Sequence, residues 1–211
     1  MNKNPSLSPH DSSSSTHSSL PRIFNQYPYP SLLDSIKNSS YQIVYLCRNP
    51  FDTFISLWHF VSQARLGSLG PLSLEDSFDK FQWNWRILPF FFHVLRFWTK
   101  SLERPEKLLF LKFEGMKEDI NSQIKRLVEL LGCPFSVEKE RDVAIEGISK
   151  FCSFSNLKNK KANKTGKSIP GIENNTLFRR DEVGNWVNFL TPMMVHRLNK
   201  IMEQKLAGSG L

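Results

Sequence analysis

One arginine of the sequence stands where a phosphate group could be bound. Arg48 comes directly after the apolar run 41–47, and Ser56 lies in the segment that follows. A loop that leads from a strand into a helix presents free backbone N–H groups and the positive end of the helix dipole, which suits a phosphate. A guanidinium adds a forked charged donor, and a hydroxyl adds another. The alternative is an ordinary surface, on which Arg48 pairs with Asp52 and Ser56 meets solvent.

A second basic cluster lies near the C-terminus. Arg179 and Arg180 follow Phe178, and a Gly-Asn-Trp sequence comes four residues further on at 184–186. Two adjacent arginines in a loop are usually solvated charge. Taken alone, this pair leaves both a ligand role and a plain surface role open.

The overall charge favours an anionic partner. Twenty-eight Lys and Arg against 20 Asp and Glu give a formal charge of +8, which suits a nucleotide, a nucleic acid or a membrane surface. The most apolar stretch, 87–98, is broken by Pro89, His93 and Arg96 and is too short to cross a bilayer, so we expect no membrane partner. The three cysteines lie far apart in the sequence. They suggest neither a disulfide framework nor a metal site, and they fit a reducing, cytoplasmic compartment.

The elements that must position these residues alternate between strand and helix. The run 41–47 is short, β-branched and aromatic, which predicts a strand buried on both faces of a parallel sheet. A helix is expected from Asp52 to about Ala64. A second buried strand is predicted over 107–112, followed by a helix that ends at Gly132. This alternation predicts an α/β fold, with a parallel sheet flanked by helices.

The remaining segments are assigned from their caps and composition. Residues 1–20 are rich in serine and predict a disordered tail, so the domain is expected to occupy 21–211. Helices are predicted over 73–85, 89–100 and 137–151, and a last one begins at the cap Thr191. Residues 156–184, rich in Asn, Lys and Gly, predict a long surface loop.

Together the two basic clusters carry a family resemblance. Tyr45 to Phe60 resembles the 3′-phosphate-binding signature of plant cytosolic sulfotransferases. Phe178 to Trp186 is similar to their C-terminal Arg-Lys-Gly…Gly-Asp-Trp motif. Lesser matches lie between them, at 70–75, 111–114, 132–135 and 163–168. The similarity runs from about Pro21 to Leu211 and rests on several long motifs in the same order.

The resemblance implies a P-loop-type nucleotide-binding fold and transfer of a sulfonate from 3′-phosphoadenosine 5′-phosphosulfate (PAPS) to a hydroxyl of a small molecule. It implies no metal. Carried over position by position, it assigns one group of residues to the 3′-phosphate and another to the adenosine. The first group is Arg48, Ser56, Arg179, Arg180 and the backbone at Asp181, and the second is Phe113, Cys152 and Phe154.

Three departures from the family pattern shape the expectation. No Lys-Ser/Thr-Gly-Thr loop, which holds the 5′-phosphosulfate in the family, occurs before Arg48. The position of the family's general-base His falls at Gln26 or Tyr27, and neither is a useful base near neutral pH. Asp181 stands where the family has Gly, and its carboxylate would repel a phosphate. We therefore expect an N-terminally truncated member, without the N-terminal strands and the 5′-phosphosulfate loop.

Three hypotheses follow. The chain is a working sulfotransferase with a small hydroxylated acceptor, in which a second subunit of a homodimer would contribute the absent groups. Alternatively, it is an inactive homologue that binds adenosine 3′,5′-bisphosphate (PAP) without turnover. The third, a basic nucleic-acid-binding protein, is disfavoured because no recognised motif or basic helical stripe accompanies the charge.

Overall fold

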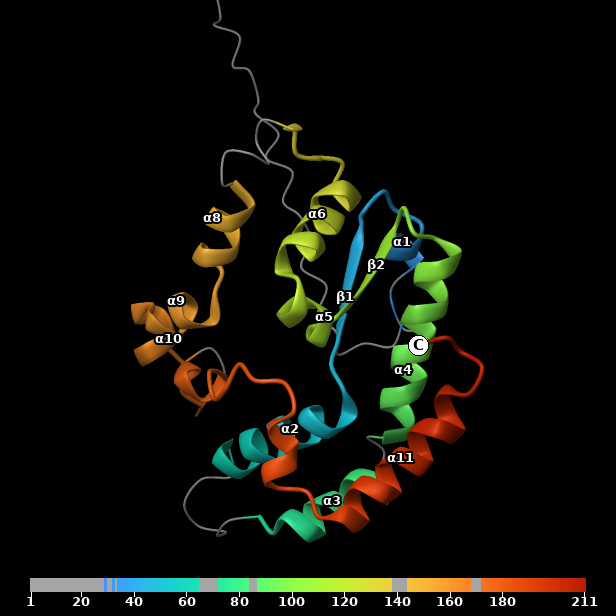
Figure 1. The fold of residues 1–211 in the computed structure, drawn as a ribbon, viewed down its shortest axis with the longest axis vertical. Helices are drawn as coiled ribbons and strands as arrows, with labels where there is room; N and C mark the ends of the chain where they lie inside the picture. The colour runs from blue at the N-terminus through green and yellow to red at the C-terminus, as the bar shows by residue number, and fades with distance from the viewer. Residues whose placement is uncertain are drawn as a thin grey trace, which may run out of the picture.

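The structure, a computed structural model, describes residues 29, 32, 34–64, 72–83, 87–137, 144–167 and 172–211. The predicted tail and Gln26 lie outside the described residues. The described elements follow in the order α1 (Asp34–Lys37), β1 (Ile43–Cys47), α2 (Pro50–Ala64), α3 (Leu74–Trp83), α4 (Ile87–Glu103), β2 (Leu108–Lys112), α5 (Phe113–Glu118), α6 (Ile120–Leu130), α8 (Ala144–Phe151), α9 (Phe154–Asn159), α10 (Lys161–Thr165), η2 (Asn174–Leu177), η3 (Asn185–Asn188) and α11 (Pro192–Leu206). Figure 1 shows their arrangement.

A parallel pair of strands forms the centre of the fold. β1 pairs with β2 from Ile43 opposite Leu108 to Cys47 opposite Lys112, so both strands end at the same edge. Helix α4 lies on one side of the pair and α5 and α6 lie on the other (Figure 1). The predicted α/β class, with a parallel sheet flanked by helices, is confirmed.

One face of the sheet is fully covered and the other only in part. Ile43 and Tyr45 of β1 are buried with side chains of α4, and the ring of Tyr45 stacks on Phe97 at 4.2 Å between centroids. On the opposite face, β2 is covered, whereas Val44 and Leu46 of β1 are 37% and 39% exposed. The prediction that the first strand is buried on both faces was wrong, because α6 packs against β2.

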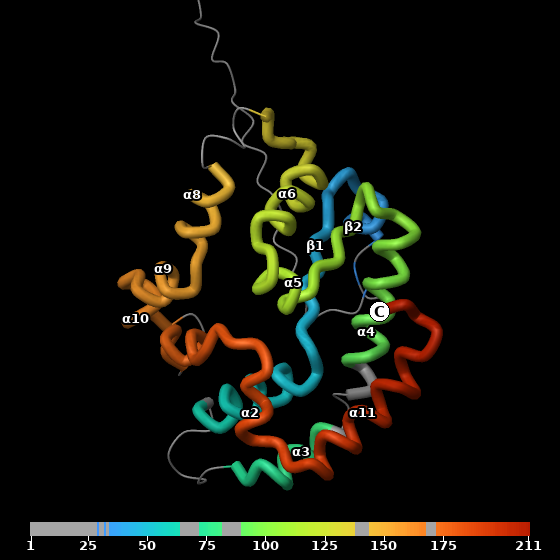
Figure 2. The backbone as a smooth tube through the Cα atoms, viewed as in Figure 1, coloured from blue at the N-terminus to red at the C-terminus, as the bar shows by residue number. Residues whose placement is uncertain are grey.

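A second core joins the N-terminal half of the sequence to the C-terminal helix. Aromatic side chains of α2, α3 and α4 pack there with Met194 and Leu198 of α11. The backbone trace shows α11 starting beside α3 and running toward α4 (Figure 2), and Arg197 of α11 pairs with Asp79 of α3. Thr191 caps α11, because its hydroxyl accepts a hydrogen bond from the Met194 N–H, as the sequence predicted. This core places the C-terminal part of the chain against α2.

The segment predicted as a long loop contains short helices. The hydroxyl of Ser153 caps α9 by accepting from the Asn156 N–H, and Asn174 bonds back to α10 through Ala162 and Gly166. These helices lack an apolar period and depend on caps and amide contacts instead, so hydrophobic spacing could not reveal them. Within the described residues, no helix is both long and apolar enough to cross a membrane.

Candidate nucleotide site

Arg48 lies where strand β1 gives way to helix α2, and it contacts three separate parts of the chain. Its Nη1 atom donates to the Ser56 hydroxyl at 3.3 Å, and its Nη2 atom donates to the Glu182 carbonyl at 2.6 Å. The guanidinium also lies over the Phe113 ring, 4.6 Å from its centroid. The side chain is 22% exposed, so it is largely held by protein and still reaches solvent. Two of these partners, Ser56 and Phe113, belong to the site inferred from the resemblance.

Asp52 ties the two basic clusters together. Its buried carboxylate accepts from the backbone N–H of Gly184 at 2.7 Å and from that of Trp186 at 3.1 Å. The same carboxylate lies 3.9 Å from Nη2 of Arg48. Gly184 has φ 81°, a left-handed conformation that favours glycine. The pairing of Arg48 with Asp52 and the contact of Arg48 with Ser56 therefore occur together, although the sequence offered them as alternatives.

The start of α2 is fixed from two directions. Asn49 caps the helix, since its Oδ1 atom accepts from the Asp52 N–H at 2.8 Å. The Glu114 carboxylate of α5 accepts from both the backbone and side-chain N–H groups of Asn49, each at 2.9 Å. These contacts join the ends of the two parallel strands through the segments that follow them. Asn49 and Glu114 were missed as site residues, although the cap signal, an Asn three residues before an Asp, is visible in the sequence.

Arg179 and Arg180 lie beside Arg48. Burial and the nearby charges of Arg180 and Arg48 lower the pKa of Arg179 from its ordinary value. Arg180 donates to the Asn185 side-chain oxygen at 3.1 Å and is half exposed. The Glu182 carboxylate lies 3.6 Å from Arg180 and offsets part of this charge. Guanidinium groups that lower one another's pKa suit an anion, because an anion among them would relieve their repulsion. The structure thus brings the two sequence clusters to one place.

Asp181 turns its carboxylate toward helix α5. The Lys117 ammonium lies 2.7 Å from it, and both side chains are partly exposed. The repulsion expected from a carboxylate at this position is therefore offset by a cation that the sequence gave no reason to place there. Lys117 is a further residue of the site that sequence reasoning missed.

A cavity of about 550 Å³ adjoins this cluster. Phe113 and Asp181 lie on its wall, and so do Cys152 and Phe154 from the opposite side. Phe154 also packs against Phe178, with 5.6 Å between ring centroids. The walls of the cavity come from α5, α6, α8 and α9 and are mostly apolar. The three residues that the resemblance assigned to adenosine therefore share one cavity next to the arginines.

Among the described residues, no group of three or more His, Cys, Asp or Glu side chains could hold a metal ion. Gln26, at the approximate position of the family's base, lies outside the described residues, so the geometry around it is not described. The described part of the site consists of a cationic cluster and an apolar cavity beside it. Such an arrangement suits a phosphate attached to an aromatic or other apolar group.

Comparison with known proteins gives one consistent result. A family model described as the sulfotransferase domain matches residues 7–210. Cytosolic sulfotransferase 14 of Arabidopsis thaliana is 46% identical over 90% of this chain and 56% of its own length. Cytosolic sulfotransferase 15 of the same plant is 45% identical over 90% of this chain and 54% of its own length. The chain thus spans just over half the length of these curated relatives.

Solved structures show the same fold. A mouse sulfotransferase complexed with PAP has a TM-score of 0.68 at 24% identity, covering 87% of this chain and 64% of its own. A retinol dehydratase in complex with androsterone and PAP has a TM-score of 0.65 at 22% identity, covering 84% of this chain and 50% of its own. Both likenesses concern the fold.

Proposed function

Since the chain belongs to the sulfotransferase family, we propose that its arginine cluster and the adjoining cavity bind the 3′-phosphoadenosine end of PAPS. Arg48, Ser56, Arg179 and Arg180 would bind the 3′-phosphate, with the backbone at Asp181 beside them. Phe113, Cys152 and Phe154 would contact the adenosine. The reaction served is transfer of the sulfonate to a hydroxyl of a small molecule, with PAP as the product.

The observation that carries this proposal is the double hydrogen bond from Gly184 and Trp186 to Asp52. It holds the loop with Arg179 and Arg180, the arginine loop, against the loop that contains Arg48. Cations that are distant in sequence can therefore contact the same phosphate. A phosphate dianion gains most from several charge-assisted donors at the same site. The aromatic wall next to this point suits a purine ring, because aromatic side chains stack on bases.

The role of the 3′-phosphate site in the reaction follows from which bonds change. The acceptor oxygen forms a bond to sulfur and gives up its proton to a base or to water, while the bond between sulfur and the 5′-phosphate oxygen breaks and PAP leaves with that electron pair. The 3′-phosphate is unchanged throughout. The residues of this site therefore position the donor and retain the product, and they supply binding energy that does not change during the chemical step.

A nucleotide-binding role without turnover remains the second candidate. It is favoured by the sequence at 26–27, where Gln and Tyr stand near the position of the family's base. An amide cannot accept a proton from the acceptor hydroxyl near neutral pH. Both candidates require the same 3′-phosphate site, and only the transfer step separates them.

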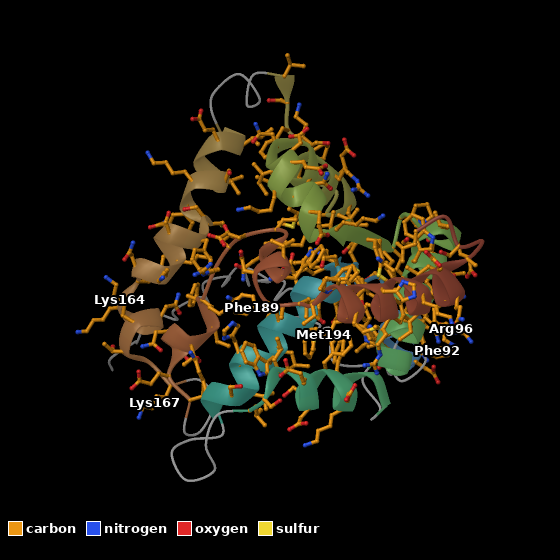
Figure 3. The ribbon with its side chains drawn as sticks, turned by 60° about the horizontal axis from the view of Figure 1, so that its bottom comes forward. Phe92, Arg96, Lys164, Lys167, Phe189 and Met194 are labelled. Atoms are coloured by element: carbon orange, nitrogen blue, oxygen red, sulfur yellow. The ribbon has the colours of Figure 1, made fainter. Side chains whose placement is uncertain are left out.

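Calorimetric titration with PAP, and with 5′-AMP as the ligand that lacks the 3′-phosphate, tests the site. We expect PAP to bind more tightly than 5′-AMP, and Arg48→Ala to weaken PAP by about 10- to 100-fold, because a charge-assisted hydrogen bond contributes about 1.5–3 kcal/mol. Arg96→Ala is the matched control, because Arg96 is an exposed arginine whose guanidinium lies over the Phe92 ring. Figure 3 shows Arg96 and Phe92 at the edge of the molecule, away from Phe189, which follows η3. Equal binding of the two ligands, or equal loss in both variants, would overturn the proposal.

A second assay separates the two candidates. The purified protein is supplied with labelled PAPS and a panel of phenols and other small hydroxylated compounds. Transfer above background that Arg48→Ala abolishes supports the enzyme. PAP binding with no transfer to any acceptor supports binding without turnover. Tight, salt-sensitive binding of random DNA with no PAP binding would contradict both and favour a nucleic-acid partner.

A further inference from the structure

Asn185 is a buried amide that holds one arginine of the site. It is 4% exposed and occupies the first position of η3. Its Oδ1 atom accepts a hydrogen bond from Nη1 of Arg180 at 3.1 Å and another from Nδ2 of Asn188 at 3.3 Å. These two donors decide the orientation of the amide, because its NH₂ group in the same place would face them with donors of its own. The oxygen of Asn185 therefore faces Arg180.

The NH₂ group of the same amide makes no comparable contact. Its Nδ2 atom is inaccessible to solvent and has no hydrogen-bond partner among the described residues. A buried donor without a partner destabilises the folded state, so an amide at this position calls for a reason other than stability. The contact of its oxygen with Arg180 supplies one.

The backbone on both sides of Asn185 is bonded to helix α2. The N–H groups of Gly184 and Trp186 donate to the carboxylate of Asp52, at 2.7 and 3.1 Å. That carboxylate lies 3.9 Å from Nη2 of Arg48. The amide of Asn185 is therefore carried by a stretch of backbone that cannot shift without breaking these bonds.

The charges around Arg180 give the neutrality of this acceptor its importance. The Glu182 carboxylate lies 3.6 Å from Arg180, but both side chains are more than half exposed, so solvent screens the pair. The carbonyl of Glu182 accepts from Nη2 of Arg48, so both arginines contact the same residue. Position 185 is buried, and a negative charge there would be screened far less. An amide oxygen orients the guanidinium of Arg180 and leaves its charge available to a phosphate.

We propose that Asn185 is a positioning residue of the 3′-phosphate site, which orients Arg180 through an uncharged acceptor and thereby sets the preference for ligands that carry a 3′-phosphate. This inference rests on the proposed function and extends it. Asn185 acts through Arg180 and does not itself contact the ligand. A carboxylate in its place would compete with the phosphate for the guanidinium, and a methyl group would leave the guanidinium without its acceptor.

Calorimetric titration of Asn185→Asp and Asn185→Ala with PAP and with 5′-AMP tests this role. We expect Asn185→Asp to weaken PAP binding by about 5- to 30-fold, because a charge at this distance changes an ionic equilibrium by about tenfold or more. Asn185→Ala should weaken PAP binding by about 2- to 10-fold, the effect of losing one neutral hydrogen bond. Binding of 5′-AMP, which lacks the 3′-phosphate, should stay unchanged in both variants.

Two comparisons show whether the effect passes through Arg180. Asn199→Asp is the matched control, because it adds the same charge at an exposed position of α11, and it should bind PAP as the wild-type protein does. In the Arg180→Ala background, Asn185→Ala should cause no further loss of PAP affinity, since the arginine that it orients is absent. Thermal unfolding confirms that each variant folds.

The outcomes separate this inference from the function on which it rests. Equal weakening of PAP and 5′-AMP, or the same loss from Asn185→Ala with and without Arg180, would show a structural role alone and overturn the inference. Unchanged PAP affinity in Asn185→Asp would reject it as well, and the nucleotide site would remain. Failure of the wild-type protein to bind PAP rejects the nucleotide site itself. If Asn185→Asp does not fold, the cycle of Asn185→Ala with Arg180→Ala still decides the question.

Discussion

The carboxylate of Asp52 accepts the backbone N–H of Gly184 at 2.7 Å across 132 positions of sequence. With the second bond from Trp186, it fixes the path of the chain through the arginine loop. The fold brings this loop and α2 together through the aromatic core, and Asp52 sets their register. The arginine cluster is therefore a product of tertiary structure and exists in neither segment alone.

We expect Asp52→Asn to lower the free energy of unfolding by about 2–4 kcal/mol, because a buried charged acceptor with several donors is lost and a new N–H group must be accommodated. Urea denaturation followed by tryptophan fluorescence measures the change. Asp79→Asn is the control: Asp79 is 58% exposed and pairs with Arg197, so its loss should cost less than about 1 kcal/mol. Equal effects of the two substitutions would contradict the tethering role.

Lys117→Ala should weaken PAP binding by about 2- to 10-fold, because it leaves the Asp181 carboxylate without its neutralising partner near the phosphate site. Asp181→Gly in the same background should restore the affinity. Titration of the two single variants and the double variant with PAP gives the coupling between the side chains. Additive effects, with no rescue in the double variant, would show that the pair has no bearing on the phosphate.

Phe154→Ala should weaken PAP by about 5- to 100-fold, since stacking of a base on an aromatic ring contributes about 1–3 kcal/mol. The comparison is Phe151→Ala, which removes a ring that is 61% exposed and lies outside the cavity wall. Binding is measured by calorimetry, and thermal unfolding confirms that both variants fold. A loss of affinity in Phe151→Ala as large as that in Phe154→Ala would show that the cavity does not hold the base.

The cysteines should differ in reactivity toward iodoacetamide. Burial, and secondarily the Glu114 carboxylate, raise the pKa of the Cys47 thiol to about 11. At pH 8 the thiolate, which is the reactive form, is then about two orders of magnitude rarer than in a free cysteine. Cys133 and Cys152 are exposed and should react first. The rate at Cys47 should keep rising until about pH 11.

Mass spectrometry of the alkylated peptides measures these rates, and a nucleotide adds a second comparison. Cys152 lines the cavity and Cys133 does not, so PAP should slow alkylation of Cys152 alone. Protection of Cys133 to the same extent would indicate a general tightening of the protein. Labelling of Cys47 as fast as that of the exposed cysteines would contradict its burial.

The sequence was sufficient to predict the elements with a strong local pattern. The strand at 107–112, the cap at Ser73 and the turn at Gly132 all follow from apolar runs and from cap and turn residues, and the structure contains each of them. Arg48 and Ser56 were identified because a strand, a loop and a helix follow one another over a short span. Local patterns are reliable where neighbouring residues decide the conformation.

The remaining features depend on contacts between distant segments. The hydrogen bonds from the backbone N–H groups of Gly184 and Trp186 to Asp52 could not be predicted. A backbone N–H is present at almost every residue, so the sequence does not indicate which acceptor it will find. The pairing of Lys117 with Asp181 requires that α5 lie against the arginine loop, which only the fold determines. The exposure of Val44 and Leu46 likewise depends on which strand α6 covers.

The separation of the two arginine clusters along the chain has a consequence for the order of folding. During synthesis, the strand and loop that carry Arg48 leave the ribosome long before Arg179 and Arg180, and a domain generally folds as a unit. On the proposed function, a nucleotide would therefore have no complete site until the loop with Arg179 and Arg180 has reached α2, where Asp52 holds it. A nucleotide that binds there would then stabilise the folded state by mass action. It could not assist the earlier steps of folding, because its site would not yet exist.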